Sequence, residues 1–168
     1  EESPIPGFLF DDPVVREELA LYYTSVRRAD DAVGAILNAL EESGKEEDTI
    51  VVFLSDHGMP LPFAKTQLYH HSTRTPLIIR WPGVVQPGTV DDRHMVSAID
   101  FLPTFCDMVG TRLPEGLPGS SFLPLLHGKH QESRSVVFKE YNENARGRRR
   151  PVRGGETPPS RHLSHPGS

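Results

Sequence analysis

The most constraining feature of the sequence is a run of β-branched and aromatic residues placed shortly after a long amphipathic helix pattern. The run at 49–55 reads Thr-Ile-Val-Val-Phe-Leu-Ser, a composition typical of a strand covered on both faces. Before it, Asp12 and Pro13 supply a cap and a first-turn proline, and apolar residues recur at steps of three or four until Gly44. This spacing predicts a helix over 12–43. The stripe comprises Val15, Leu19, Tyr22, Val26, Ala29, Val33, Ile36 and Leu40.

Further elements follow the same alternation of helix and strand. A second strand is predicted over 76–81, where the Pro82-Gly83 turn ends it, and Asp100 is placed to cap a short helix that runs to Val109. An apolar segment at 122–126 and a last strand at 136–138 complete the pattern. A helix joined by a short loop to a buried strand is half of a βαβ unit. The predicted fold class is therefore α/β, a three-layer sandwich.

Length and composition indicate a single domain without a membrane span or a disulfide. The chain has 168 residues, enough for one ordinary domain, and no targeting segment is recognisable at its start. It is 36% hydrophobic with a mean hydropathy of -0.41, and no apolar run approaches the ~18 residues that a membrane span needs. Cys106 is its single cysteine, which excludes an intramolecular disulfide and any multi-cysteine metal site.

Charge divides the chain into two parts. Residues 144–168 carry six arginines and one glutamate, a net charge of +5, whereas residues 1–143 carry a net charge of -10. The end of the chain is also rich in proline and glycine and poor in apolar residues, which predicts a disordered tail over 146–168 after a domain over 1–145. The negative net charge of residues 1–143 does not favour nucleic-acid binding, so we expect no nucleic-acid partner. An RNA-binding arm is the less favoured interpretation of the basic tail.

Chemistry is expected where the first strand ends, because ligands of open α/β sheets gather beyond the carboxyl ends of strands. There the chain continues into Asp56, His57 and Gly58. A carboxylate and an imidazole can both bind a divalent ion, but two ligands do not make a site. The alternative is structural: Asp56 capping the next turn and His57 bonded to the backbone. His70 and His71 would point to opposite faces of an extended segment, so at most one of them could join such a site.

The residues around this turn form a specific string. Residues 55–69 read Ser-Asp-His-Gly-Met-Pro-Leu-Pro-Phe-Ala-Lys-Thr-Gln-Leu-Tyr, and residues 74–83 read Arg-Thr-Pro-Leu-Ile-Ile-Arg-Trp-Pro-Gly. Together with 100–104 and 119–126, this string resembles the C-terminal part of the catalytic domain of the sulfatase family, in the alkaline-phosphatase-like superfamily. The resemblance covers about residues 12–145. The two prolines before Lys65 are most similar to those of heparan N-sulfatase (sulfamidase) relatives.

The resemblance implies specific roles. Asp56 and His57 would be two ligands of the active-site divalent cation, and Lys65 would contact the sulfate oxygens as a catalytic and substrate-binding residue. Calcium is the first candidate for the cation. Because His57 stands where many sulfatases have asparagine, Mg²⁺ and Mn²⁺ remain open. The implied partner is a sulfated small molecule or saccharide. The oligomeric state stays open, and so does the compartment, although members of the family are often exported.

One departure from the family pattern affects activity. Sulfatases use a cysteine converted to formylglycine within Cys-x-Pro-x-Arg, whereas Cys106 is followed by Asp-Met-Val-Gly and is expected to be a small core residue. The nucleophile and the first acidic metal ligands of the family would precede residue 1. We therefore expect a fragment that is inactive alone, from a parent that hydrolyses sulfate esters or N-sulfates of a saccharide. The alternatives are a phosphonate or phosphate-diester hydrolase of the same superfamily and a non-catalytic binding domain.

Overall fold

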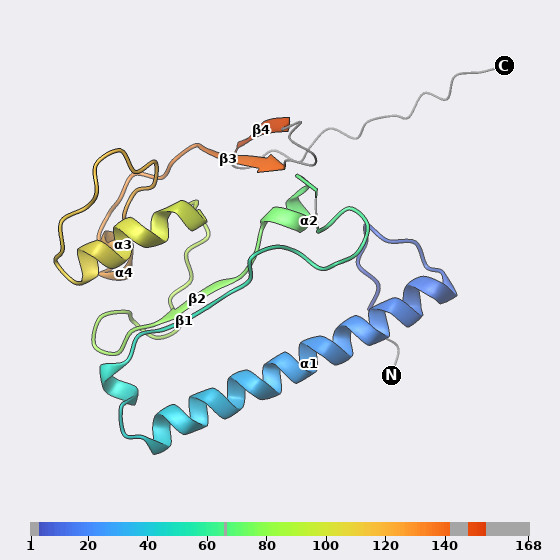
Figure 1. Ribbon diagram of the computed structural model, residues 1–168, viewed down its shortest axis with the longest axis horizontal. Coiled ribbons are helices and arrows are strands. Elements are labelled where there is room, and N and C mark those ends of the chain that lie inside the picture. The colour runs from blue at the N-terminus through green and yellow to red at the C-terminus, as the bar shows by residue number, and fades with distance from the viewer. Residues whose placement is uncertain (1–3, 66, 142–147, 154–168) are drawn as a thin grey trace. The chain divides into compact units, whose positions relative to one another are not determined.

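The elements of the chain are given by a computed structural model, which describes residues 4–65, 67–141 and 148–153. Figure 1 labels the helices and strands in chain order. The helices are α1 (Pro13–Glu42), α2 (His70–Thr73), α3 (Phe101–Met108) and α4 (Leu123–Leu126), with short 3₁₀ turns η1 (Glu46–Asp48) and η2 (Ala98–Asp100). The strands are β1 (Val51–Leu54), β2 (Leu77–Arg80), β3 (Val136–Tyr141) and β4 (Arg148–Arg153).

Helix α1 confirms the predicted helix and its start. The Val14 amide donates to Asp12 Oδ1 at 2.8 Å, and Pro13 occupies the first turn, where its missing N–H costs nothing. At the other end the Gly44 amide donates to the Glu41 carbonyl, and Gly44 has a φ of 67°, a conformation that glycine adopts without steric cost. Local signals therefore set both ends of this element.

The apolar stripe of α1 is covered only in part. Leu19 is its buried residue, whereas the side chains of Val26 and Ile36 are 45% and 68% exposed. None of the described helices is both long and apolar enough to cross a membrane. The 30 residues of α1 carry many charges, so its length alone does not make it a candidate.

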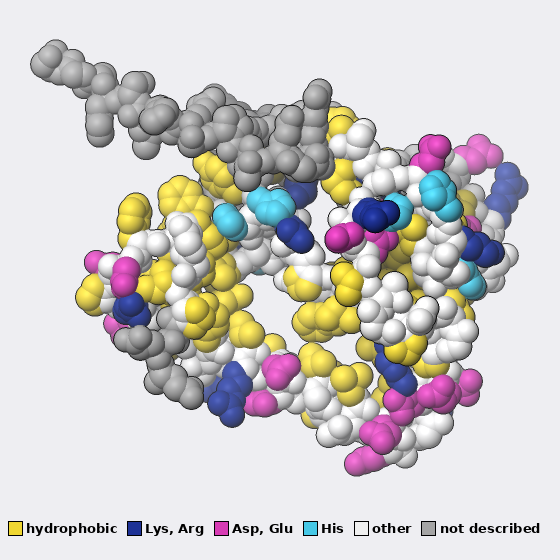
Figure 2. Space-filling view, turned by 180° about the vertical axis from the view of Figure 1, so that it is seen from behind, with side chains coloured by type: hydrophobic (Ala, Val, Ile, Leu, Met, Phe, Trp, Pro, Cys, Tyr) yellow, Lys and Arg dark blue, Asp and Glu magenta, His cyan; other side chains and the backbone are white. Residues whose placement is uncertain are grey.

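Strands β1 and β2 pair antiparallel, with Val51 opposite Arg80 and Leu54 opposite Leu77. The prediction that the first strand is covered on both faces is wrong for the described structure. Phe53 and Ile78 are 43% and 62% exposed, and Figure 2 shows many hydrophobic side chains at the surface. The physical reason is that β1 and β2 form a sheet of only two strands here, which leaves part of each face without a covering layer.

The chain divides into two compact units, residues 1–90 with 126–128 and residues 91–125 with 129–168. In the second unit the core forms around α3, where Thr104 is fully buried and Cys106 is buried as predicted. Asp100 does not cap α3 in the predicted way. Its carboxylate accepts instead from the amides of Ser97 at 2.7 Å and Ser120 at 2.9 Å, which joins η2 to the loop before α4.

Strands β3 and β4 also pair antiparallel, with Val136 opposite Arg153 and Tyr141 opposite Arg148. Strand β4 lies inside the stretch predicted to be disordered, so for residues 148–153 the structure differs from that prediction. Strand pairing uses backbone groups and needs no apolar side chains, so a composition argument does not detect it. The predicted tail at 146–147 and 154–168 lies outside the described residues, and the domain boundary after residue 145 stays a prediction.

Candidate active site

The turn after β1 is held by backbone contacts to α2. The Gly58 amide donates to the Ser72 carbonyl at 2.9 Å, and the Ser55 hydroxyl donates to the His57 carbonyl at 2.8 Å. A Cβ built on Gly58 would lie 1.8 Å from the carbonyl oxygen of His71. The turn can approach α2 this closely only because residue 58 has no side chain.

Asp56 and His57 lie together on this turn. The distance between Asp56 Oδ2 and His57 Nε2 is 3.4 Å, and their side chains are 81% and 39% exposed. His57 Nδ1 lies 2.8 Å from the Gly58 carbonyl, which can only accept, so Nδ1 donates there. Of the two ring nitrogens, Nε2 is therefore the one that could bind a cation. Two ligands about 2.4 Å from a calcium ion, at neighbouring octahedral positions, lie roughly 3.4 Å apart. The pair therefore fits as two ligands of one divalent cation.

The described residues do not complete that metal site. They contain no group of three or more His, Cys, Asp or Glu side chains that could hold a metal ion. His70 and His71 lie in helix α2, so the extended geometry assumed for them is wrong, and the His71 ring stacks on Phe8 with centroids 4.1 Å apart. A complete site needs ligands in addition to the pair that this turn supplies.

Lys65 is tied to the same turn by a closed loop. The Lys65 amide donates to the Met59 carbonyl at 3.0 Å, and the Ala64 amide donates to the Leu61 carbonyl at 3.1 Å. Ala64 is fully buried and anchors the loop, while the Lys65 side chain is exposed. The backbone of Lys65 is thus bonded to the residue that directly follows Gly58, which links the predicted cation ligands to the predicted sulfate-binding lysine.

A concave surface of about 280 Å³ lies on this loop. We call it the Lys65 groove; it is lined by Pro60, Leu61, Pro62, Phe63, Lys65 and Gln67. Phe63 has a φ of 66°, and its ring meets the ring of Tyr69 edge-on, with centroids 6.0 Å apart. Sequence reasoning did not single out Phe63, because no pattern of residue types predicts a positive φ at a phenylalanine.

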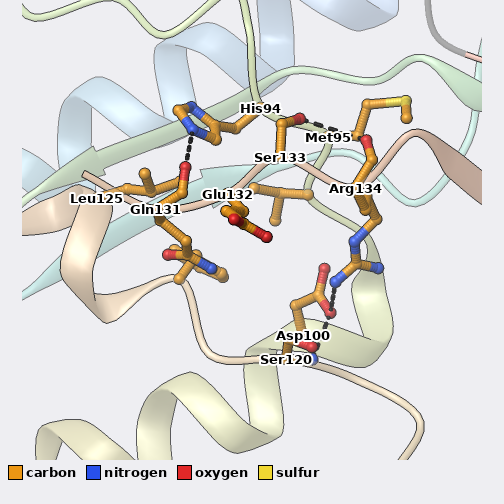
Figure 3. A pocket seen from close by; sticks show the side chains of 11 residues that line it. His94, Met95, Asp100, Ser120, Leu125, Gln131, Glu132, Ser133 and Arg134 are labelled. Carbon is orange, nitrogen blue, oxygen red and sulfur yellow. Dashed lines mark hydrogen bonds and ion pairs between the residues drawn. The ribbon is translucent and has the colours of Figure 1, made fainter. Parts of the chain in front are cut away.

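A second cavity, of about 250 Å³, lies in the other unit and is shown in Figure 3. The Arg134 guanidinium donates to Asp100 Oδ1 at 2.6 Å on one side of it, and Asp100 is 1% exposed. On the other side the His94 ring lies between Asp91 Oδ2 at 2.7 Å and the Gln131 carbonyl at 2.9 Å. These contacts join the segment at 131–134 to the two loops that face it, an arrangement that fastens loops together.

The His94 environment favours the imidazolium form. The Gln131 carbonyl, then the Asp91 carboxylate, raise the pKa of His94 above its usual value, because both accept hydrogen bonds from the ring. Only a doubly protonated ring donates from both nitrogens. Sequence reasoning missed this cluster, since Asp91, His94 and Gln131 are brought together by folding across 40 residues.

Comparison with known proteins places the chain in a family. The family model named Sulfatase matches residues 5–111, which is more than half of the chain. The chain therefore belongs to the sulfatase family, as the string around Asp56 predicted.

Two relatives illustrate the extent of the match. An ulvan-active sulfatase of Formosa agariphila is 36% identical over 71% of this chain and 20% of its own length. The human N-sulphoglucosamine sulphohydrolase is 35% identical over 74% of this chain and 27% of its own length. The chain thus spans about a fifth to a quarter of these relatives.

Solved structures agree with the fold. A Bacteroides thetaiotaomicron protein assigned to the sulfatases superposes with a TM-score of 0.70 and 28% identity, over 78% of this chain and 30% of that one. A protein solved with its substrate, D-glucosamine-2-N,6-O-disulfate, superposes with a TM-score of 0.64 and 29% identity. The match covers 82% of this chain and 30% of that one. The phosphonate monoester hydrolase of Agrobacterium radiobacter superposes with a TM-score of 0.65 and 30% identity, over 79% of this chain and 27% of that one. The fold is therefore part of the three-layer α/β sandwich of the alkaline-phosphatase-like superfamily, as predicted.

Proposed function

We propose that this chain forms the cation-binding and sulfate-binding part of a sulfatase active site. The protein that contains it would hydrolyse sulfate esters or N-sulfates of a saccharide. The observation that carries the proposal is the Asp56–His57 pair, with 3.4 Å between Oδ2 and Nε2, on a turn whose next residue is bonded to Lys65. Membership of the sulfatase family supports it, and so does the sulfated glucosamine for which one similar protein is named and with which another was solved.

Each residue has a defined task in this proposal. Asp56 and His57 hold a divalent cation, for which calcium is the first candidate. Mg²⁺ and Mn²⁺ are alternatives because His57 stands where many sulfatases have asparagine. When bound, the cation polarises the sulfate oxygens and stabilises developing negative charge. The Lys65 ammonium binds a sulfate oxygen and orients the group. The Met59–Lys65 bond ties the backbone of that lysine to the residue that follows the turn of the cation ligands.

We place the nucleophile outside residues 1–168. The formylglycine implied by the family resemblance comes from a Cys-x-Pro-x-Arg stretch, and this sequence contains none. Its single cysteine, Cys106, is buried within α3, in the other unit. Residues 1–168 therefore provide binding groups for the reaction but not its covalent step.

A second candidate is phosphonate monoester hydrolysis, which the likeness to the Agrobacterium radiobacter enzyme favours. The same cation ligands and lysine can hold a phosphonate, since both groups present anionic oxygens around a tetrahedral centre. The ratio of kcat/KM values for an aryl sulfate and an aryl phosphonate separates the two. A ratio in favour of the phosphonate would replace our proposal with this one.

The decisive experiment uses Lys65→Ala in a protein that contains this chain together with a Cys-x-Pro-x-Arg segment. We expect kcat/KM for a sulfate ester to fall roughly 10²- to 10³-fold, because a donor to developing charge is lost. Lys45→Ala is the matched control: Lys45 is an exposed lysine of the same unit, outside the groove, and its loss should leave kcat/KM unchanged. Unchanged kcat/KM in Lys65→Ala would contradict the role given to Lys65. Binding of a sulfated sugar without any hydrolysis would favour the non-catalytic alternative.

A further inference from the structure

The backbone of Phe63 is held in a conformation that its side chain disfavours. Its φ is 66°, and it is the only residue other than glycine with a positive φ in the part of the chain that the structure describes. A Cβ in this region crowds the neighbouring carbonyl, so phenylalanine is seldom found there. Such strained backbone conformations persist where contacts with the surrounding structure hold them in place, and they are common at functional sites.

The strain does not bury the Phe63 ring. Its side chain remains 48% exposed and lines the Lys65 groove, while the Met59–Lys65 and Leu61–Ala64 backbone bonds close the loop beneath it. Exposed apolar residues such as Phe53 and Ile78 lie instead on regular strands, where an uncovered sheet face explains their exposure. Phe63 belongs to no such face, so its position needs another explanation.

The groove combines an apolar ring with polar groups. Phe63 and the edge-on Tyr69 form an aromatic pair, Lys65 supplies a positive charge, and Gln67 supplies an amide. A pyranose ring has an apolar face of C–H groups that packs on an aromatic ring, and a rim of hydroxyls that needs hydrogen-bonding partners. A groove of about 280 Å³ lies near the lower limit for drug-sized ligands, which suits a single sugar ring.

We propose that Phe63, supported by Tyr69, binds the sugar ring whose sulfate group contacts Lys65. This inference rests on the proposed function and deepens it: the lysine recognises the sulfate, and the aromatic pair selects sulfates carried on a pyranose. Phe63 acts on substrate choice and takes no part in the chemical step.

The test measures ligand binding to the 168-residue chain by isothermal titration calorimetry. The probes are glucosamine 6-sulfate and inorganic sulfate. Phe63→Gly removes the ring and places glycine where the backbone has a positive φ, so its melting temperature should equal or exceed that of the parent. Phe63→Tyr retains the ring. Phe10→Gly is the matched control, since Phe10 is 80% exposed and lies outside the groove.

We expect the parent to bind glucosamine 6-sulfate more tightly than inorganic sulfate. In Phe63→Gly the ratio of these two affinities should fall by roughly 3- to 10-fold, the scale of one aromatic contact. Phe63→Tyr and Phe10→Gly should keep the parent ratio. A parent without preference for the sugar, or an unchanged ratio in Phe63→Gly, would overturn the inference.

The proposed function can fail separately in the same titrations. If Lys65→Ala binds inorganic sulfate as well as the parent does, the role of Lys65 is wrong, whatever Phe63 does. If the parent self-associates in sedimentation and Phe63→Gly abolishes this, Phe63 contacts a second copy of the chain, and the sugar-binding inference is overturned.

Discussion

At the scale of single residues, Gly58 determines whether the turn after β1 can meet α2. A methyl group at this position would lie 1.8 Å from the His71 carbonyl oxygen, which belongs to the backbone and cannot rotate away. We expect Gly58→Ala to lower the free energy of unfolding by ~2–3 kcal/mol, at the upper end of overpacking costs. Urea unfolding measures the change.

Gly34→Ala is the control for that substitution. Gly34 lies inside α1, and a Cβ there would have no neighbour within 4 Å. Because glycine weakens a helix interior, alanine should raise the free energy of unfolding by about 0.5–1 kcal/mol. Equal effects of the two substitutions would show that contact with His71 does not restrict residue 58.

His94 makes the stability depend on pH. The pKa of His94 is raised above its usual value in the folded protein by the Gln131 carbonyl and by Asp91, against smaller opposing effects of burial and of Arg93. A raised folded pKa means that the stabilisation is complete below the unfolded pKa, about 6.5, and is lost as pH rises through the folded value. The free energy of unfolding should therefore decrease as pH rises from about 6.5.

The variant His94→Asn identifies the group responsible. It should remove most of that pH dependence, because asparagine does not titrate. Urea unfolding between pH 6 and 9 compares it with the parent, and His130→Asn, an exposed histidine of the same unit, serves as the control. An undiminished slope in His94→Asn would contradict the assignment.

At the scale of elements, Thr104 joins α3 to the loop before α4. Its hydroxyl donates to the Asp100 carbonyl at 2.6 Å and accepts from the Phe122 amide at 3.0 Å, all within the buried core. Thr104→Val leaves that amide without a partner, and we expect a loss of ~1–3 kcal/mol in the free energy of unfolding.

Thr24→Val provides the comparison, measured by the same urea unfolding. The Thr24 hydroxyl also donates to the carbonyl four residues earlier, at 2.7 Å, but on the exposed face of α1. Water replaces that bond, so the change should stay within about 0.5 kcal/mol. If both valine variants lost the same stability, the Thr104 to Phe122 contact would not be the cause.

At the scale of the whole molecule, the chain exposes apolar side chains and supplies only part of the metal site that we propose. Asp56 and His57 are the two cation ligands that we propose, and the described residues offer no cluster of three His, Cys, Asp or Glu side chains. We expect the purified 168-residue chain to bind divalent cations weakly and to show no turnover of an aryl sulfate. Calorimetric titration with Ca²⁺, Mg²⁺ and Mn²⁺ and an aryl sulfatase assay measure both. Metal-dependent hydrolysis by this chain alone would refute the division of the active site that we propose.

The sequence alone was sufficient where a feature depends on near neighbours. The start of α1 follows from Asp12 and Pro13, and its end follows from Gly44. The position of Asp56 and His57 directly after a strand follows from the run at 49–55. The family also follows from sequence, because the string around Lys65 is specific as an ordered set of residues.

Tertiary structure decided the features that join distant residues. The Phe63 backbone has a positive φ within the loop that the Met59–Lys65 bond closes. The pKa of His94 is raised by the Gln131 carbonyl, which lies 37 residues away in sequence but 2.9 Å away in space. The exposure of β1 depends likewise on how many strands pair beside it. Residue type determines what a side chain can do chemically, and backbone propensity acts over a few positions. Which groups meet across a loop or a sheet is set by packing and hydrogen bonds that only the folded chain makes.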